Sequence, residues 1–401
     1  MKGVTGMKKK ILFVIPSLRS GGAEKSLISV LSLFDYEKYE VDLLLFRRDG
    51  LFFEKIPNTI NHLYDTTEYE IFDGNGKDAI QYFLKKLKIF AVVDRIKYTK
   101  IFTEKNEDIR DKMLWNFLKK RLPKIKKKYD CAIGYLEGNA NNCVIEMINA
   151  DKKICYIHND IAKLSHSHEM YKKVFEKADK VVTVSDICLD SLNKEFPEFA
   201  EKFCVIENIT SRSLIKADCM EEKVYPQTGS KATILTVGRC SEQKNIELAV
   251  DACKELVNRG RKIKWYHIGK GELEDKVKNY VARSGLENCF IMLGERSNPY
   301  PYMEQCDIYV QPSKFEGKSI AIDEVKCLNK PIVVTDFPTV FDQLTDGVNA
   351  LICKMNKDDM ADKIEKLIDD KELAKSFVTN LMNGEAGNEK ELEKLYFLIE
   401  N

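Results

Sequence analysis

The stretch FEGKSIAIDEVKC, residues 315–327, contains residue types that bind phosphate in many nucleotide-binding proteins. Gly317, Lys318 and Ser319 match the last positions of a P-loop, the glycine-rich loop whose backbone wraps the phosphates in ATPases and GTPases. That loop needs another glycine five positions before Gly317, but this position is Pro312. Because proline has no N–H to offer to a phosphate, the pattern argues against a P-loop.

Glu316 and Glu324 lie at the start of a predicted helix. The sequence predicts helix from about Ser319 to Leu328, since Pro331 disfavours helix at the residue before it. A helix N-terminus offers unpaired N–H groups to a phosphate, and carboxylates accept hydrogen bonds from the hydroxyls of a sugar or ribose. Two glutamates eight residues apart are also common as solvated surface charges, so the spacing alone leaves both interpretations open.

Two cations follow a predicted strand in the second half of the chain. VGRCSEQKN places Arg239 and Lys244 five residues apart on a loop, which suits a diphosphate; two solvated surface cations are the alternative. Glycine-rich turns follow other strands, with Gly269 in IGKGELED and with Gly21 and Gly22 in PSLRSGGAEKS. The last turn opens a helix and could face an anion, or its glycines could simply ease a tight turn. It lacks the G-x-G-x-x-G dinucleotide fingerprint.

Composition indicates a globular protein without a charge bias. The 401 residues favour two domains, and 64 Lys and Arg against 63 Asp and Glu give no indication of nucleic-acid binding. The 12 cysteines occur singly, as expected for reduced thiols in a cytosolic protein, and the one close histidine pair, His166 and His168, is not expected to hold a metal. No apolar run has the length of a transmembrane helix, and KILFVIP predicts a first strand and not a signal peptide.

Strand-like and helical segments alternate, and the alternation restarts after residue 230. The predicted strands are KILFVIPSL, YEVDLLLF, YDCAIGYL, KKICYIH and KVVTVSD, followed by ATILTVGR, IKWYHIGKG, CFIMLGE, IYVQPS and PIVVTD. This pattern predicts two parallel α/β sheets with crossover helices. We expect an N-terminal domain at 1–207, a polar linker at 208–230, a C-terminal domain at 231–384, and a C-terminal helix at 385–401 that returns to the N-terminal domain.

Jointly, these motifs resemble those of retaining glycosyltransferases of family 4, of the bacterial surface-polysaccharide type. The spacing from Glu316 to Glu324 fits the E-x7-E motif of that family, and VGRCSEQKN resembles its diphosphate loop. GGAEKS, YIHND, ADKVVTVSD, DGVNALIC and the long segment from LGERSNPY to PIVVTD are also similar to the family. The resemblance covers about residues 8–355 and is weakest between 50 and 130. It implies the GT-B fold, in which two Rossmann-like parallel-sheet domains face an interdomain cleft, the first binding the acceptor and the second the nucleotide-sugar.

The resemblance also implies roles for individual residues. Arg239 and Lys244 would hold the donor diphosphate and steady the departing nucleotide, Glu316 would bond hydroxyls of the transferred sugar, and His158 would lie near the attacking hydroxyl. Glu324 would bond the ribose. The implied donor-binding set is Gly21, Gly22, Gly238, Gly269, Gly317, Lys318, Ser319 and Glu324. Gly-Lys-Ser stands where the family often has Gly-Phe-Gly, so Lys318 is expected to add a contact to sugar or phosphate.

No D-x-D motif is present to hold a divalent metal, so neither a metal nor another cofactor is expected. The resemblance implies same-face attack with retention, a nucleotide-sugar donor (a UDP-sugar), and a surface glycan or lipid-linked glycan as acceptor. Nucleic acid is not an expected partner, and the expected location is cytoplasmic, at the inner face of the plasma membrane. The alternatives are a sugar-nucleotide epimerase or phosphorylase on the same fold, or a non-catalytic sugar-nucleotide-binding protein.

Positive charge is concentrated in residues 85–128, which hold 16 Lys and Arg against five Asp and Glu, although the whole chain carries only +1. Apolar residues interleave with these cations, as in interfacial helices: Leu84, Leu87, Phe90, Trp115, Phe117 and Leu118. The stretch therefore predicts contact with an anionic membrane surface. The alternative is a solvated helical face whose apolar residues lie in the core.

Overall fold

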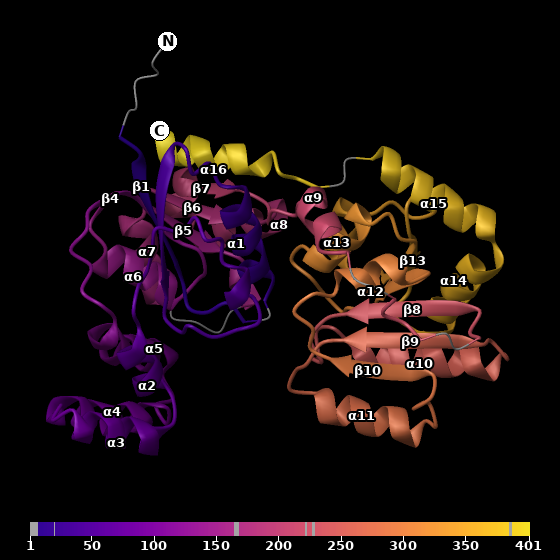
Figure 1. The fold of residues 1–401 in the computed structure, drawn as a ribbon, viewed down its shortest axis with the longest axis horizontal. Coiled ribbons are helices and arrows are strands. Elements are labelled where there is room, and N and C mark those ends of the chain that lie inside the picture. Colours follow the sequence, from indigo (N-terminus) through magenta and orange to yellow (C-terminus); the bar gives the residue numbers. More distant parts are fainter. Residues whose placement is uncertain (1–6, 20, 164–167, 221–222, 227–228, 385–386) are drawn as a thin grey trace, which may run out of the picture. The chain divides into compact units, whose positions relative to one another are not determined.

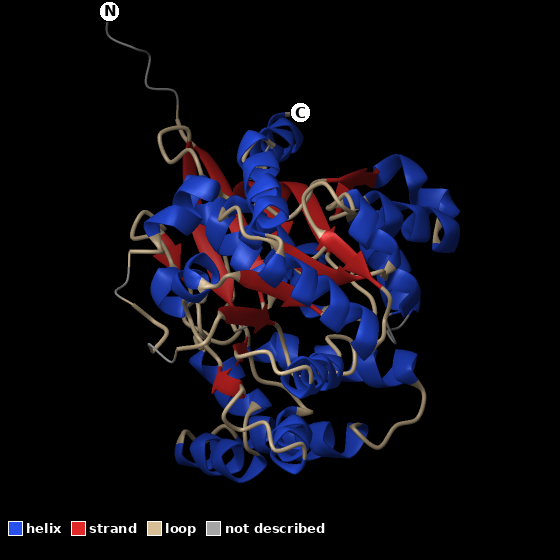
Figure 2. Cartoon of the chain, turned by 90° about the vertical axis from the view of Figure 1, so that its right-hand side faces the viewer, coloured by secondary structure: helices blue, strands red, loops and turns tan. Residues whose placement is uncertain are grey.

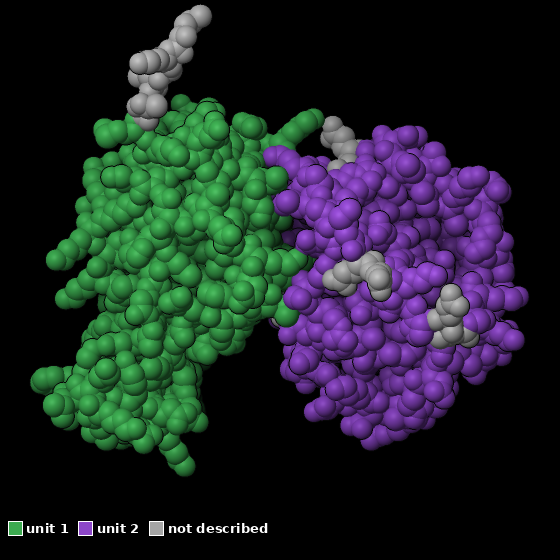
Figure 3. Space-filling model, in the orientation of Figure 1, with its two compact units in different colours: residues 1–208, 390–401 green, residues 209–389 purple. Residues whose placement is uncertain are grey.

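A computed structural model describes residues 7–19, 21–163, 168–220, 223–226, 229–384 and 387–401. Ser20 and His166 lie outside the described residues. The chain divides into two compact units (Figure 3): unit 1 comprises residues 1–208 and 390–401, and unit 2 comprises residues 209–389. In both units helices flank the strands (Figure 2), as the alternation of the sequence predicts.

Unit 1, coloured from indigo to magenta in Figure 1 with its C-terminal helix in yellow, is built on a seven-stranded sheet in the order β3-β2-β1-β4-β5-β6-β7, in which every pairing is parallel. Its strands are β1 (Lys9–Ile15), β2 (Tyr39–Leu45), β3 (His62–Leu63), β4 (Tyr129–Gly134), β5 (Ala150–Ile157), β6 (Lys180–Thr183) and β7 (Phe203–Val205). Its helices are α1 (Gly22–Leu33), α2 (Thr67–Asp73), α3 (Gly76–Lys85), α4 (Ile89–Ile101), α5 (Glu107–Leu118), α6 (Asn139–Met147), α7 (His168–Lys177), α8 (Asp186–Glu195) and α16 (Glu391–Glu400). Continuous apolar runs such as ILFVI in β1 are buried, as expected for a parallel sheet covered on both faces.

Unit 2 contains a six-stranded parallel sheet in the order β10-β9-β8-β11-β12-β13. Its strands are β8 (Ala232–Val237), β9 (Ile263–Ile268), β10 (Phe290–Gly294), β11 (Ile308–Gln311), β12 (Ile332–Thr335) and β13 (Leu351–Cys353). Its helices are α9 (Arg212–Ala217), α10 (Ile246–Asn258), α11 (Glu274–Arg283), α12 (Tyr300–Gln305), α13 (Ile320–Cys327), α14 (Lys357–Asp369) and α15 (Lys371–Asn383). Helix α13 differs by one residue at each end from the predicted helix at 319–328, because Ser319 and Leu328 are its caps.

Three strands were missing from the prediction: β3, β7 and β13. Each has two or three residues, too few for a periodic signal, and each lies at the edge of its sheet. The predicted linker at 208–230 also differs from the structure, since residues 209–230 belong to unit 2. Ile215 and Cys219, one helical turn apart around α9, are buried in the core of that unit, which holds the segment against it.

The C-terminal helix α16 packs on unit 1. The Tyr396 ring stacks on Tyr39 at a centroid distance of 5.4 Å, and the Tyr39 hydroxyl donates to Glu400 at 2.7 Å. In the part of the chain that the structure describes, no helix combines the length and the apolar character needed to cross a membrane.

Each sheet changes winding direction at one pair of neighbouring strands. β1 and β4 are neighbours in unit 1, and β8 and β11 are neighbours in unit 2, while the strands that follow each member run outward in opposite directions. In open parallel sheets, ligands bind at the carboxyl ends of such strands. We therefore expect ligand sites in unit 2 at the loops after β8 and β11. In unit 1 we expect them at the loops after β1 and β4.

Candidate functional site

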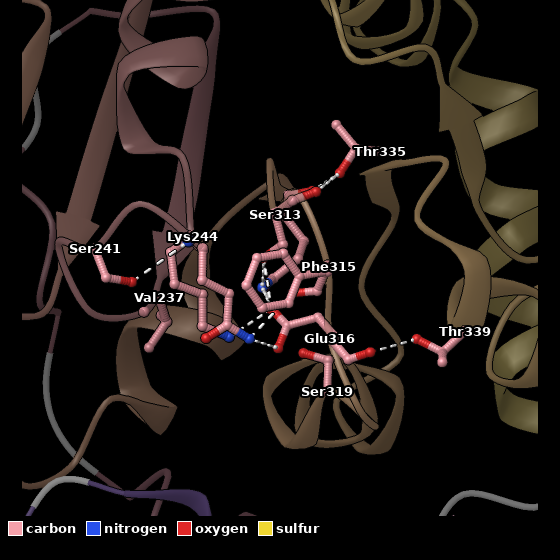
Figure 4. A network of polar contacts seen from close by, with 12 residues as sticks. Val237, Ser241, Lys244, Ser313, Phe315, Glu316, Ser319, Thr335 and Thr339 are labelled. Carbon is pink, nitrogen blue, oxygen red and sulfur yellow. Dashed lines mark hydrogen bonds and ion pairs between the residues drawn. The ribbon is translucent and has the colours of Figure 1, made fainter. Parts of the chain in front are cut away.

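The loops after β8 and β11 meet through a half-buried ion pair (Figure 4). Lys244 Nζ lies 2.6 Å from Glu316 Oε1, and the exposed fractions of the two side chains are 17% and 6%. The two residues are 72 positions apart in sequence, and the pairing of β8 with β11 brings their loops together. A cation and a carboxylate thus share one site at the carboxyl edge of the sheet.

Further hydrogen bonds hold the Glu316 carboxylate. Ser313 Oγ donates to Oε1 at 2.5 Å and Gln311 Nε2 at 3.0 Å, while Gln243 Nε2 donates to Oε2 at 3.3 Å. Tyr309 in β11 fixes the Gln311 amide by donating to its Oε1 at 2.6 Å. Sequence analysis did not single out Ser313, Gln311 or Gln243, because polar side chains at a strand end are common and only their convergence marks the site.

Arg239 lies in the same loop as Lys244 but differs from it in environment. Its side chain is exposed, and the guanidinium group makes no hydrogen bond or ion pair with any other residue that the structure describes. Lys244, in contrast, runs its aliphatic stem past Gly238, where an added methyl group would come within 3.3 Å of the Lys244 Cδ. Of the two predicted cations, Lys244 is therefore held by Glu316, whereas the exposed Arg239 side chain can bind a ligand.

A buried histidine and a glycine at the end of β9 contact this loop at Gly238. His267 is fully buried, burial lowers its pKa to about 4, and its neutral ring donates from Nε2 to the Gly238 carbonyl at 3.0 Å. Gly269 has φ +147°, and a methyl group there would lie 1.9 Å from the Gly238 oxygen. Gly269, predicted to bind the donor, thus lies against the loop that carries Arg239, and His267 was missed because a lone histidine in a strand carries no signal.

Glu324 is buried in α13, with 2% of its surface exposed. It accepts a hydrogen bond from the Tyr300 hydroxyl at 2.9 Å, and burial of Tyr300, together with this carboxylate, raises the pKa of Tyr300. The interpretation of Glu324 as a solvated surface charge is therefore wrong.

The sequence predicted unpaired N–H groups at the N-terminus of α13, but the Ser319 N–H is paired. The Ser319 amide donates to Gln343 Oε1 at 2.9 Å, and Gln343 Nε2 donates back to the Ser319 carbonyl at 2.9 Å. The Ser319 hydroxyl is buried and makes no hydrogen bond to a described residue. Gly317 and Lys318 lie in the half-buried turn just before this cap.

The remaining predicted residues belong to unit 1. Gly21 and Gly22 open α1, and a methyl group at Gly21 would lie 1.9 Å from the Glu24 carboxylate, so a carboxylate covers the helix start at which an anion was expected. His158 follows β5, its amide donates to Glu137 at 2.9 Å, and its ring stacks on Tyr156. Burial lowers the pKa of His158, and Glu137 offsets this only in part, so the ring is neutral at pH 7.

The part of the chain that carries these loops matches a known protein family. Residues 221–382 match the family model described as "Glycosyl transferases group 1". This part of the chain is similar to the domain of group 1 glycosyltransferases. The matched residues include Arg239, Lys244, Glu316 and Glu324.

Two curated relatives of the chain carry glycosyltransferase names. A Campylobacter jejuni N-acetylgalactosamine-N,N'-diacetylbacillosaminyl-diphospho-undecaprenol 4-alpha-N-acetylgalactosaminyltransferase is 25% identical over 371 residues, which are 92% of this chain and 93% of that protein. An uncharacterized glycosyltransferase of Methanocaldococcus jannaschii is 26% identical over 213 residues, 52% of this chain, and the match spans only 55% of its length.

The architecture of two parallel α/β sheets is that of the GT-B fold. Anabaena HepE, solved with UDP and glucose, has a TM-score of 0.69 at 18% identity, with 98% of this chain and 100% of that chain covered. Staphylococcus aureus TarM, solved as a point mutant in complex with UDP, has a TM-score of 0.66 at 16% identity over 98% of this chain and 100% of its own.

Proposed function

We propose that this protein is a retaining family 4 glycosyltransferase that moves a hexose-type sugar from a UDP-sugar to a surface-polysaccharide or lipid-linked glycan. The observation that carries the proposal is the Lys244–Glu316 ion pair at the carboxyl ends of β8 and β11. The exposed Arg239 lies in the same loop as Lys244. Cations suit the diphosphate of a nucleotide-sugar, and a carboxylate suits the hydroxyls of its sugar.

In this mechanism the charges of the protein act on the leaving group. Breaking the bond between sugar and phosphate leaves a nucleoside diphosphate whose negative charge Arg239 and Lys244 neutralise, a contribution that grows toward the transition state. The departing phosphate takes the proton of the acceptor hydroxyl, which attacks from the same face and so preserves the anomeric configuration. Glu316 orients the transferred sugar, Glu324 binds the ribose, and the neutral His158 contributes no positive charge.

The relatives support the choice of donor and acceptor. HepE and TarM were solved with UDP, and the name of the Campylobacter relative describes transfer to a sugar carried on diphospho-undecaprenol. We therefore propose a UDP-sugar donor and a lipid-linked or surface glycan acceptor for this chain as well, with the reaction taking place at the cytoplasmic face of the membrane.

The direct test incubates the protein with UDP-sugars and glycan acceptors and follows the products by NMR. Release of UDP with an acceptor glycoside of retained anomeric configuration is expected, and EDTA should leave the rate unchanged because no metal takes part. An epimerised UDP-sugar or a free sugar phosphate would instead indicate an epimerase or a phosphorylase, and donor binding without any product would indicate a binding protein.

Replacing Glu324 with alanine should weaken donor binding by about 10- to 100-fold, the range expected when hydrogen bonds to a charged acceptor are lost. Titration with UDP by calorimetry measures this effect. Because Tyr300 donates to Glu324, the matched control is Tyr300→Phe, which removes that hydrogen bond but keeps the carboxylate and should retain affinity. Unchanged UDP affinity in Glu324→Ala would rule out the ribose contact.

We propose that the membrane surface predicted within residues 85–128 lies at the turn between α3 and α4. The side chains of Leu87 and Phe90 are 84% and 89% exposed, whereas Trp115 and Leu118, predicted to interleave with the same cations, are buried in the core. Several cations further along pair with acids of unit 1: Lys119 with Glu146, Lys120 and Arg121 with Asp94, Lys127 with Glu40 and Asp42, and Lys128 with Asp151. The turn instead combines exposed apolar side chains with the exposed Lys85 and Lys86, a combination that suits an anionic lipid surface.

Co-sedimentation with liposomes tests this surface. Binding to anionic vesicles at low salt is expected, with loss of binding at high salt and to neutral vesicles, because salt screens the lysine contribution. Phe90→Ser should lower binding by about tenfold, the loss expected when one buried aromatic side chain is removed from lipid. Phe397→Ser, at another exposed phenylalanine of unit 1, is the matched control. Equal binding to both lipids, or an equal effect of the two variants, would contradict the assignment.

A further inference from the structure

His267 in β9 contacts the residues on both sides of Arg239. Its Nε2 lies 3.0 Å from the carbonyl oxygen of Gly238, and its Nδ1 lies 4.0 Å from the sulfur of Cys240. His267 and Cys240 are both fully buried. One ring of the sheet therefore contacts the backbone just before Arg239 and the side chain just after it.

The direction of these hydrogen bonds fixes the tautomer of the ring. A carbonyl oxygen only accepts, so the hydrogen of the neutral His267 ring is on Nε2, and Nδ1 is left as an acceptor. Burial raises the pKa of the Cys240 thiol to about 11, so the thiol is protonated at neutral pH and can donate to Nδ1. The donors thus run in one direction, from Cys240 through the ring to Gly238.

Backbone contacts hold the same two residues. The Gly238 amide donates to the carbonyl of the last residue of β9 at 2.9 Å, and the Cys240 amide donates to the Lys270 carbonyl at 3.0 Å. A methyl group at Gly271 would lie 2.4 Å from the Cys240 carbonyl oxygen, so the chain after β9 approaches this loop too closely for a side chain. The residues before and after Arg239 are therefore fixed, although its guanidinium has no polar partner among the described residues.

An arginine in this situation depends on its backbone for its direction. The long side chain of Arg239 has many rotamers, so the region that its guanidinium can reach is set by the position of its Cα. A charge that acts on a leaving group must be in place before the reaction, because moving it during the step would cost part of its effect. A displacement of about 1 Å can lower a rate by about 100-fold.

We propose that His267 is a positioning residue for Arg239. It holds Gly238 through Nε2 and Cys240 through Nδ1, and so fixes the loop from which the Arg239 guanidinium reaches its ligand. The inference rests on the proposed function for the chemistry that Arg239 performs, but the placement of the loop is independent of that chemistry. A histidine that only filled the core would contribute to stability alone.

Two amide substitutions probe the two ring nitrogens separately. His267→Gln places an amide nitrogen as far from Cβ as Nε2 and should keep the hydrogen bond to Gly238, whereas His267→Asn reaches only as far as Nδ1 and should lose it. We expect His267→Asn to lower kcat by about 100-fold with a smaller change in KM for the donor, and His267→Gln to retain most of the wild-type kcat. Trp265→Phe is the matched control, because it removes another buried donor of β9, from Nε1 to Thr236 at 3.0 Å, and should lower stability without lowering kcat.

Two further measurements test whether the effect passes through Arg239. In the Arg239→Ala background, His267→Asn should cause no further loss of kcat, because the residue that it positions is gone. Hydrogen–deuterium exchange of the peptide that contains Gly238 and Cys240 needs no substrate. Its amides should exchange about tenfold faster in His267→Asn than in the wild type, and at the wild-type rate in His267→Gln and Trp265→Phe.

The outcomes separate this inference from the proposed function. An equal loss of kcat in His267→Asn and Trp265→Phe, a further loss in the Arg239→Ala background, or unchanged exchange in His267→Asn would overturn the positioning role. Should His267→Asn not fold, nitrogen-15 NMR of the wild type decides: a hydrogen on Nε2 of His267 supports the contact with Gly238, and a hydrogen on Nδ1 overturns it. Faster exchange in His267→Asn, restored in His267→Gln, in a protein that turns over no UDP-sugar would support the positioning of the loop and contradict the proposed transfer.

Discussion

Arg239→Ala is expected to lower kcat by about 100- to 1,000-fold, the loss typical when one preorganised group facing a developing negative charge is removed. Arg239 has no side-chain partner among the described residues and is exposed, so its removal breaks no structural contact. Its proposed role is confined to the leaving diphosphate. The loss should therefore appear mainly in kcat, with a smaller change in KM for the donor, because leaving-group charge is greatest in the transition state.

Steady-state kinetics and thermal unfolding of the same preparation measure both effects. The melting temperature of Arg239→Ala should equal that of the wild type. Arg283→Ala, an exposed arginine on α11 in the same unit, should change neither activity nor melting temperature. A rise in KM with unchanged kcat would show that Arg239 only binds the donor and would contradict its role in the leaving step.

Lys244→Ala is expected to reduce both turnover and stability. Turnover should fall by at least about 100-fold, because the second cation at the diphosphate is lost. Stability should fall by about 1.5–3 kcal/mol, the value of a hydrogen bond to a charged group, since Glu316 keeps Ser313 and Gln311 as donors but loses its cation. Denaturant unfolding and steady-state kinetics give the two numbers.

A second substitution separates the two effects. Adding Glu316→Gln to Lys244→Ala removes the uncompensated charge, so stability should recover in part while activity stays low. Lys314→Ala is the matched control in the same group of loops, because Lys314 pairs with the exposed Glu242 and such surface pairs add little to stability. Recovery of activity in the double variant would show that Lys244 serves only to neutralise Glu316.

Local patterns determined much of what could be predicted. The ten strands named from the sequence are all present, and α13 begins and ends within one residue of its prediction, because apolar periodicity and the preference of the residue before proline act over a few positions. The motifs placed Arg239, Lys244 and Glu316 on loops after strands for the same reason. What such patterns could not show is which loops meet.

Sheet order and packing decided the rest. Lys244 and Glu316 are neighbours because β8 pairs with β11, and no local signal specifies that two strands separated by two others in sequence become adjacent. Burial also distinguishes residues of the stretch 85–128 that look alike in the sequence. Trp115 packs into the core while Phe90 remains exposed, although both occur in similar surroundings in the sequence. The amino-acid sequence by itself determined the elements and the residue types at their ends, through interactions between near neighbours. Only the tertiary structure decided which of those residues face one another, because contacts between distant segments depend on how the whole chain buries its apolar surface.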